Sequence, residues 1–540
     1  MKKPQIIIPM SGIGKRFIDA GYKNPKPLIE VDGMPIIEHV VNLFGRPDDV
    51  IFICNEVHLK ETDMTKILKR ISPNCKIYPV SNENRRGPVH AISQIFDKVD
   101  DDKEIIVSYC DYGTKWNYEK FLKETRERNA YGAIPCYTGF HPHMLGGDNY
   151  AFVKMVGDTA VEIQEKKPFT DDKMSELASN GTYYFKNGKI VKKYFKELIT
   201  KDINLNGEYY VSLVYKLLME DNLLVTTFLI DKMLQWGTPN DLEIYNSWSR
   251  YFNNLTIKQE RVFNPKNTTL ILPMAGKGSR FEDEGYVLPK PMLDIDGKPM
   301  IIQSVDCLPK SDNNIFICLG EHIKNFGIDG TLEQTYKNCN VISLDETTEG
   351  QACTCKIGVE EGGVDLESPV LISACDNGVY YDSEKYLKLL NDENVDVIVW
   401  SFRNNQTSKN NPNAYAWLDV DDDGSVKHVS CKNFIYDDPL TTHAIIGTMF
   451  FRKAKYFIDG LDQNIIKNIR TNNEFYVDDV LNQNIASGLN VKVFEVVDYL
   501  CWGTPNDYKT YNYWESFFND CTWHPYSNKR KIKEFIREDG

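Results

Sequence analysis

Short apolar runs alternate with stretches of helical periodicity along the first part of the chain. The apolar runs are rich in β-branched residues and end in a polar residue, which is typical of buried parallel strands. They occupy residues 5–10, 48–55 and 104–111, and the helical patterns occupy residues 35–44, 90–99 and 117–128. This alternation predicts an α/β fold with a mostly parallel sheet flanked by helices. Residues 150–166 instead predict a hairpin that turns at Gly157-Asp158, an antiparallel addition suited to a lid or a second substrate.

The same pattern occurs twice. Residues 6–37 read IIIPMSGIGKRFIDAGYKNPKPLIEVDGMPII, and residues 270–301 read LILPMAGKGSRFEDEGYVLPKPMLDIDGKPMI. Further on, SYCDYG in the first half is matched by SACDNG in the second, and WGTPND occurs in both halves. A repeat of this length predicts two tandem domains. We expect domain 1 at residues 1–254, a polar linker at residues 255–267 and domain 2 at residues 268–540.

Composition narrows the classes of function. The chain has 540 residues and a formal net charge of −14, which argues against a nucleic-acid partner. It has no run of 18 apolar residues, so we expect no membrane span. The 13 cysteines are scattered without CxxC pairs. Reduced thiols and a cytoplasmic location are the expectation, and the oligomeric state is left open.

Candidate chemistry lies where the predicted strands end. In each half a glycine-rich bend follows the first strand, then come an arginine and a lysine, and a later strand ends in an aspartate. Backbone amides and cations in this arrangement bind phosphates, and a carboxylate binds a metal ion. Because ligands lie beyond the carboxyl ends of parallel strands, the loop and the aspartate are expected to face one crevice. A tight bend and a helix-capping aspartate are the alternatives.

With these residues in place, the pattern resembles the sugar-nucleotidyltransferase family, in two copies. The resemblance implies a Rossmann-like fold, Mg²⁺, a nucleoside triphosphate and a sugar phosphate or similar phosphorylated acceptor. It assigns nucleotide binding to the glycines, phosphate handling to the cations and metal binding to the strand-end aspartates. The residues concerned are Gly12, Gly14, Gly87, Gly276, Gly278 and Gly350; Arg16, Lys26, Lys166, Arg280, Lys290 and Lys432; and Asp111 and Asp376.

The two halves diverge on the side that would bind the acceptor. The family's Glu-Lys pair is matched by Glu165-Lys166 in the first half and by Cys431-Lys432 in the second. The sugar-lining segment is matched by Asn180-Gly181, with Ile446 in place of the asparagine in the second half. A thiol and an isoleucine cannot hold a hydroxyl as a carboxylate and an amide do. We therefore expect the two halves to bind different acceptors.

The second metal ligand of many relatives is missing. Its places hold Gln235 and Cys501, with Asp231 and Asp498 as candidate substitutes or merely exposed strand-end charges. Glu208 and Glu474 are either pocket residues or charges favoured by a helix N-terminus.

The sequence predicts a tandem nucleotidyltransferase that transfers a nucleoside monophosphate to a phosphorylated acceptor and releases pyrophosphate. Surface or capsule polysaccharide synthesis is the expected purpose. One alternative is a glycosyltransferase of similar fold, although CDYG and CDNG carry a single aspartate rather than a D-x-D motif. The other is one catalytic half joined to one regulatory or binding half.

Overall fold

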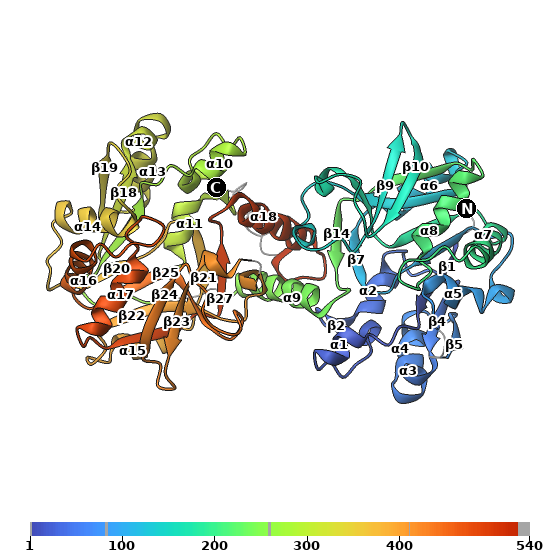
Figure 1. The fold of residues 1–540 in the computed structure, drawn as a ribbon, viewed down its shortest axis with the longest axis horizontal. Helices are drawn as coiled ribbons and strands as arrows, with labels where there is room; N and C mark the ends of the chain where they lie inside the picture. The colour runs from blue at the N-terminus through green and yellow to red at the C-terminus, as the bar shows by residue number, and fades with distance from the viewer. Residues whose placement is uncertain (1–2, 82–84, 258–260, 410, 528–540) are drawn as a thin grey trace, which may run out of the picture. The chain divides into compact units, whose positions relative to one another are not determined.

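The computed structural model describes residues 3–81, 85–257, 261–409 and 411–527. The chain divides into two compact units, Met1–Ser249 and Arg250–Gly540 (Figure 1). The division falls inside helix α9 (Pro239–Asn254).

The first unit contains a ten-stranded mixed sheet. Its strands are β1 (Gln5–Met10), β4 (Val50–Asn55), β5 (Lys76–Val80), β6 (Ile105–Ser108), β8 (Gly132–Tyr137), β9 (Ala151–Val156), β10 (Thr159–Glu165), β11 (Leu177–Ser179), β12 (Thr182–Phe185) and β13 (Val225–Leu229). Two small ribbons pair β2 (Glu30–Val31) with β3 (Met34–Pro35), and β7 (Tyr112–Lys115) with β14 (Lys232–Gln235).

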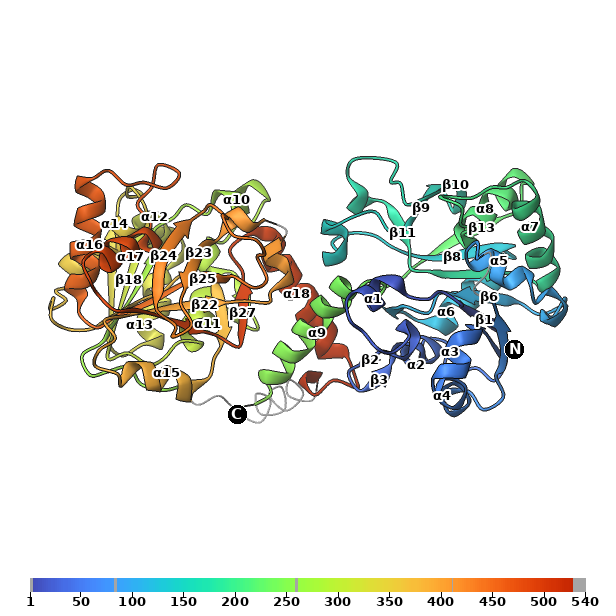
Figure 2. The same ribbon diagram turned by 60° about the horizontal axis from the view of Figure 1, so that its bottom comes forward.

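Strand direction divides this sheet into two regions. Strands β6, β1, β4 and β5 are adjacent and parallel, whereas β12, β11, β9 and β10 join by antiparallel pairing. The predicted hairpin is confirmed as β9 and β10. It lies at the end of the sheet opposite helices α3 (Glu56–Glu61) and α4 (Met64–Ile71) (Figure 2).

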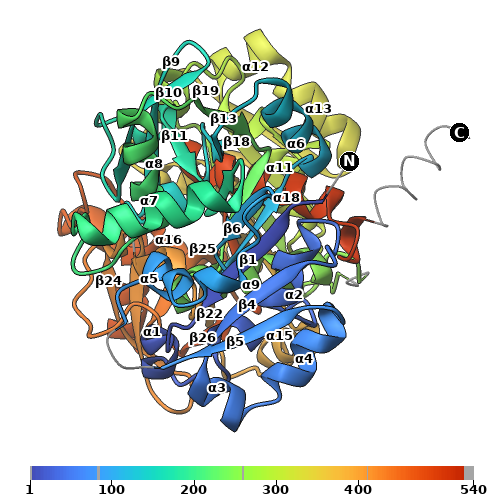
Figure 3. The same ribbon diagram turned by 90° about the vertical axis from the view of Figure 1, so that its right-hand side faces the viewer.

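Helices α5 (Pro88–Ser93), α7 (Gly188–Thr200) and α8 (Val211–Glu220) cover one face of the first sheet. Ile7 and Ile53 point from the strands into this layer, where they join Val191 and Val214 in one apolar core. Figure 3 shows α7 and α5 crossing in front of β6 and β1. The remaining helices are α1 (Lys15–Asp19), α2 (Ile36–Asn42) and α6 (Tyr118–Glu127).

The second unit has the same architecture as the first, with one strand fewer in its main sheet. Its nine-stranded sheet contains β15 (Thr269–Met274), β18 (Asn313–Leu319), β19 (Cys339–Leu344), β20 (Val370–Ile372), β22 (Val397–Phe402), β23 (Ala416–Val420), β24 (Val426–Cys431), β25 (His443–Phe451) and β26 (Val491–Glu495). Its ribbons are β16 (Asp294–Ile295) with β17 (Lys298–Pro299), and β21 (Asn377–Tyr380) with β27 (Asp498–Cys501).

Helices cover both faces of the second sheet. Helices α14 (Gln351–Glu361), α16 (Ala454–Ile466) and α17 (Val477–Ala486) share one apolar core with the strands, and α11 (Met300–Asp306), α13 (Ile328–Thr335) and α15 (Ser383–Leu390) share the other. The remaining helices are α10 (Ser279–Asp283), α12 (Gly320–Phe326) and α18 (Pro505–Asp520).

The order of strands is the same in both units. The sequence β19, β18, β15, β20, β25, β22, β26 matches β5, β4, β1, β6, β12, β8, β13, and single strand β25 takes the places of β11 and β12. The predicted α/β class, with parallel strands, flanking helices and an antiparallel addition, is confirmed.

Candidate active site

A glycine loop connects the first strand of each unit to a short helix. β1 ends at Met10, and α1 begins after Gly14, whose φ of 70° lies in the left-handed region. Gly278 precedes α10 with a φ of 72°. A Cβ at either glycine would lie 3.6 Å from the Cβ of the lysine that follows, Lys26 or Lys290. The loop therefore packs directly against the PKP lysine in both units.

That lysine reaches the strand-end aspartate. Lys26 Nζ lies 2.6 Å from Asp111 Oδ2, and Lys290 Nζ lies 2.7 Å from Asp376 Oδ2. Burial alone would lower the pKa of Lys26, but Asp111 outweighs burial and the pKa is raised. Burial likewise opposes ionisation of Asp376, yet Lys290 holds its pKa below the ordinary value. Each unit therefore keeps a charged lysine-aspartate pair at the carboxyl ends of its strands.

Two cavities meet at this pair in the first unit. The first cavity, about 320 Å³, is lined by the glycine loop, Arg85 and Gly87. The second cavity, about 380 Å³, is lined by Glu165, Lys166 and Asn180. Five residues line both cavities: Lys26, Tyr109, Asp111, Glu208 and Tyr210. A molecule in one cavity would touch a molecule in the other beside Lys26 and Asp111.

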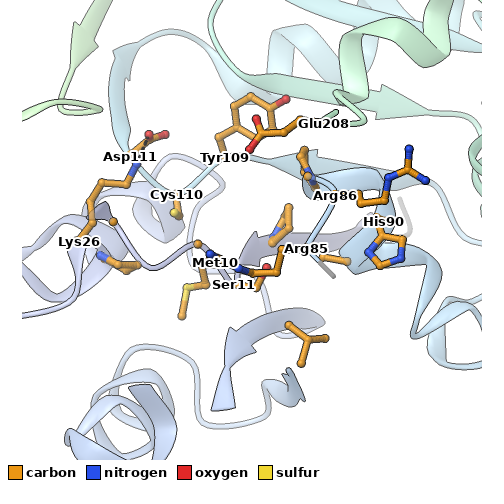
Figure 4. Close-up of a pocket in the computed structure, with 18 of the residues that line it drawn as sticks. Met10, Ser11, Lys26, Arg85, Arg86, His90, Tyr109, Cys110, Asp111 and Glu208 are labelled. Atoms are coloured by element: carbon orange, nitrogen blue, oxygen red, sulfur yellow. Dashed lines mark hydrogen bonds and ion pairs between the residues drawn. The ribbon is translucent and has the colours of Figure 1, made fainter. Parts of the chain in front are cut away.

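Arg85 and Arg86 are cations that the sequence analysis did not single out. Figure 4 shows them, with His90, on the side of the first cavity opposite Lys26 and Asp111. The corresponding cavity of the second unit, about 360 Å³, is lined by the glycine loop, Lys290, Gly350 and Glu474, but has Thr348 where the first unit has Arg85. The first cavity is thus more positive at its far end than its counterpart.

Gly87 and Gly350 allow a close approach between two loops. Gly87 has a φ of 87°, and a Cβ there would lie 2.9 Å from Tyr209 N. Gly350, with a φ of 135°, would place a Cβ 2.5 Å from Phe475 N. Backbone bonds fix the contact, since Tyr209 N donates to Arg86 O at 2.8 Å and Phe475 N to Glu349 O at 3.0 Å. These glycines line the cavities and hold their walls together.

The same two loops are joined by an ion pair whose polarity is reversed between the units. Arg86 lies over the Tyr209 ring and bonds Asp202 at 2.8 Å. In the second unit the cation comes from the other loop, because Arg470 lies over Phe475 and pairs with Glu349. Both units therefore join these two loops by an ion pair, although different residues carry the charges.

The acceptor candidates of the first unit gather in the second cavity. Ser212 Oγ donates to Glu165 Oε2 at 2.5 Å, and burial raises the pKa of Glu165 against the opposing effects of Ser212 and Lys166. Lys166 Nζ donates to Tyr210 OH at 2.6 Å. Asn180 is 1% exposed, and its Nδ2 has no hydrogen-bond partner among the described residues. This amide is available to a bound molecule.

The matching lysines share an unusual backbone. Lys166 and Lys432 have φ values of 54° and 53°, in a region that side chains rarely adopt. Lys166 lies 4.4 Å from the Tyr210 ring centre, and Lys432 lies 5.7 Å from that of Tyr476. Because such strain persists mostly at functional sites, its repetition favours a role for both lysines.

Comparison with known proteins agrees with this geometry. Residues 5–223 match the family model described as nucleotidyl transferase. The match lies within the first unit and confirms the resemblance there. The curated "Bifunctional protein GlmU" of Buchnera aphidicola subsp. Baizongia pistaciae (strain Bp) is 25% identical over 274 residues, which is 49% of this chain and 57% of the relative. The chain thus matches little more than half the relative's length.

Solved structures also resemble one half of the chain. A nucleoside-diphosphate-sugar pyrophosphorylase from Vibrio cholerae RC9 is 21% identical, with a TM-score of 0.37, over 45% of this chain and 98% of that one. A UDP-glucose pyrophosphorylase from Acinetobacter baumanii is 16% identical, with a TM-score of 0.36, over 47% and 94%.

Gln235 and Cys501 lie beside the strand-end aspartates. A Cβ at Gly237 would lie 3.2 Å from Asp111 Oδ2 and 3.6 Å from Gln235 Oε1, and Gly503 stands in the same way between Asp376 and Cys501. The first unit therefore presents a carboxylate and an amide oxygen together, whereas the second unit presents a carboxylate and a thiol.

Asp231 and Asp498 are not substitute metal ligands. Asp498 pairs with Tyr380, three residues along the ribbon from the Asn377–Cys501 pair beside Asp376. At about 3.4 Å per residue that is about 10 Å away. Asp498 also bonds Arg250 and Asn254. Asp231 precedes β14, whose far end, Gln235, lies beside Asp111.

Asp241 and Asp507 lie nearer to the strand-end aspartates Asp111 and Asp376. Neither was singled out from the sequence. The threonine three residues earlier, Thr238 or Thr504, donates its hydroxyl to the aspartate at 2.6 Å. The same hydroxyl accepts from the backbone N–H of the aspartate at 3.2 Å, so the threonine caps the helix that begins in the GTP segment. Burial raises the pKa of Asp241, and Asp111 contributes to the rise. The repeated WGTPND segment was the available signal.

The remaining predicted residues are placed as follows. Arg16 lines the second cavity rather than the first, and Arg280 is near enough to Asp376 to lower its pKa. Gly12, Gly14, Gly276 and Gly278 line the loop cavities, and Glu208 and Glu474 line them too. Gly181, with a φ of 93°, packs against Tyr109.

In the part of the chain that the structure describes, no three His, Cys, Asp or Glu side chains form a metal-binding group. No described helix combines the length and the apolar character that crossing a bilayer requires.

Proposed function

We propose that the chain transfers a nucleoside monophosphate from a nucleoside triphosphate to a phosphorylated, hydroxyl-bearing acceptor such as a sugar phosphate, and releases pyrophosphate. We assign one such site to each unit. The formation of activated precursors for surface polysaccharides, in the cytoplasm, is the purpose that we propose.

The observation that carries the proposal is the meeting of two cavities at Lys26 and Asp111. A two-substrate transfer needs the donor and the acceptor to touch at one point, where cations balance the developing charge. The first cavity has a glycine loop and arginines for a triphosphate. The second has Lys166 for the acceptor phosphate, with Glu165 and Asn180 for hydroxyl groups.

The chemistry needs little from the protein beyond positioning. An oxygen of the acceptor phosphate attacks the α-phosphorus, the bond between that phosphorus and the bridging oxygen to the β-phosphate breaks, and pyrophosphate leaves. The acceptor phosphate is already an anion, so no general base is required. Lys26 neutralises charge at the junction of the cavities, and Lys166 holds the incoming phosphate.

Mg²⁺ fits this donor set, because it is commonly held by one or two carboxylates together with substrate phosphates and water. Asp111, beside Gln235 Oε1, would hold it in the first unit and Asp376 in the second. The ion would neutralise triphosphate charge. Lys26 and Lys290 would then exchange their aspartate contact for contact with phosphate.

Two alternatives are weaker. A glycosyltransferase would use a finished nucleotide sugar and release no pyrophosphate. A purely regulatory second unit would have no need of the partly buried Lys290–Asp376 pair or of the strained Lys432 backbone.

The test measures pyrophosphate released by the full chain from each of the four nucleoside triphosphates, with a panel of hexose 1-phosphates and polyol phosphates. Pyrophosphate formed only when triphosphate and acceptor are both present supports the proposal. Acceptor-dependent release of a nucleoside diphosphate from a nucleotide sugar, without pyrophosphate, would contradict it.

A further inference from the structure

The second unit has no glutamate at the position that matches Glu165, but the helix that faces this position carries a carboxylate that the first unit lacks. Glu165, at the end of β10, accepts a hydrogen bond from Ser212 in the first turn of α8. The matching residues, each 266 positions later, are Cys431 at the end of β24 and Asp478 in the first turn of α17. A strand carboxylate facing a helix hydroxyl has become a strand thiol facing a helix carboxylate.

The two arrangements have the same backbone frame. Glu165 pairs with Ala151 across the hairpin, and Cys431 pairs with Ala416, the residue that matches Ala151. Helix α17 is fixed to β24 by Asn482, whose side chain bonds both Val429 N and Val429 O at 2.9 Å. The facing positions therefore correspond in space and not only in sequence number.

Asp478 is within electrostatic range of Lys432, the lysine that the acceptor phosphate would need. Burial raises the pKa of Asp478 to about 6, Lys432 opposes that rise and Asp479 adds to it. Apart from its own backbone amide, no described group donates a hydrogen bond to Asp478. Its neighbour Asp479 differs, because Thr471 donates to Asp479 Oδ2 at 2.8 Å. Of the two acidic residues, Asp478 is the one available to a ligand.

We propose that Asp478 is the acceptor-binding carboxylate of the second unit and holds an acceptor hydroxyl while Lys432 holds the phosphate. This inference rests on the proposed function of that unit. The assignment also explains why the two units would bind different acceptors. In the second unit the carboxylate comes from a helix rather than a strand, and its side chain is one methylene shorter than that of Glu165.

Other residues that line the acceptor cavity of the first unit also differ in the second unit. Tyr109, Asn180 and Tyr183, which line the second cavity, are matched by Ala374, Ile446 and Met449. Smaller or less polar groups therefore take the place of two phenols and an amide. The second unit is suited to an acceptor that presents fewer hydroxyl groups and more apolar surface than the acceptor of the first.

The test uses the full chain with the first unit silenced by Asp111→Asn. The acceptor is the member of the phosphate panel that gives the fastest pyrophosphate release, and KM is measured for it and for the triphosphate. We expect Asp478→Asn to raise the acceptor KM about tenfold or more, with the triphosphate KM within about twofold, because a hydrogen bond to a charged group is lost.

Asp479→Asn is the matched control and is expected to leave both constants unchanged. The exchange Cys431→Glu with Asp478→Ser recreates the first-unit arrangement and is expected to recover most of the acceptor binding that Asp478→Ser alone loses. Melting temperatures of all variants report folding.

An unchanged acceptor KM in Asp478→Asn, or an equal rise in both KM values, overturns the assignment of Asp478 while leaving the proposed function intact. If the second unit releases no pyrophosphate with any acceptor of the panel, its proposed function is wrong, and the assignment falls with it.

Discussion

Replacing Gly87 with alanine tests how closely the two cavity loops approach. Gly87 has a φ of +87°, and the new Cβ would lie 2.9 Å from Tyr209 N and 3.0 Å from Tyr209 O. The left-handed backbone costs an alanine about 1–2 kcal/mol. Overpacking against backbone atoms adds about 1–3 kcal/mol. The sum predicts a loss of about 2–5 kcal/mol in the stability of the first unit.

Gly21 offers a matched control. Its φ is +86°, but no atom lies within 4 Å of an added Cβ. Gly21→Ala should therefore lose only about 1–2 kcal/mol. The difference between the two variants isolates the contact with Tyr209.

Scanning calorimetry of the full chain measures both variants. A unit of this size changes its melting temperature by about 2–4 °C per kcal/mol. We expect Gly87→Ala to lower the transition of the first unit by about 4–20 °C and Gly21→Ala by about 2–8 °C. Added triphosphate should raise the melting temperature of Gly21→Ala but not of Gly87→Ala, because only Gly87 lines the first cavity. Equal losses, with triphosphate stabilisation retained in both, would refute the reasoning.

Two further predictions concern charges that differ between the units. Arg86→Glu should lower the melting temperature of the first unit only slightly, because its pair with Asp202 is exposed to solvent. Adding Asp202→Arg should restore stability, since the double variant has the polarity of the second unit's pair. Failure of the double variant to recover any melting temperature would contradict this. Asp478, which faces Lys432, Asp479 and Cys431, has a folded pKa of about 6 against an ordinary 3.8, so the folded state binds its proton more tightly and stability should fall as pH rises between these values. Asp478→Asn should therefore raise the melting temperature of the second unit at about pH 7 and leave it nearly unchanged near pH 4, and an equal effect at both pH values would count against the placement of Asp478.

The sequence predicts the part of the site that depends on strand ends. Gly12, Gly14, Lys26 and Asp111 follow strands whose carboxyl ends meet in any parallel sheet, so their convergence needs no knowledge of side-chain packing. The repeat adds a second instance of the same geometry at Lys290 and Asp376.

Other parts depend on partners that sequence spacing does not reveal. Of the two interpretations of Asp231 and Asp498, the structure favours strand-end charges, because the antiparallel ribbons carry both residues away from Asp111 and Asp376. Arg85 and Arg86 have no cationic counterparts at 348 and 349, so the repeat did not point to them. Asp478 compensates for Cys431 only through the facing of α17 and β24, a tertiary contact.

The central claim is that both units transfer a nucleotide, each to its own acceptor. Pyrophosphate release is measured with the acceptor panel for the wild type, for Asp111→Asn, for Asp376→Asn and for the double variant. We predict that each single substitution lowers release at least about 100-fold with one set of acceptors, since each removes the carboxylate that would hold the charge-stabilising Mg²⁺ in one unit. Release with the other set should stay within about twofold, because sites in separate units act independently, and the double variant should lose both. A single variant with unchanged release for every acceptor, or one that abolishes release for all of them, would contradict the claim.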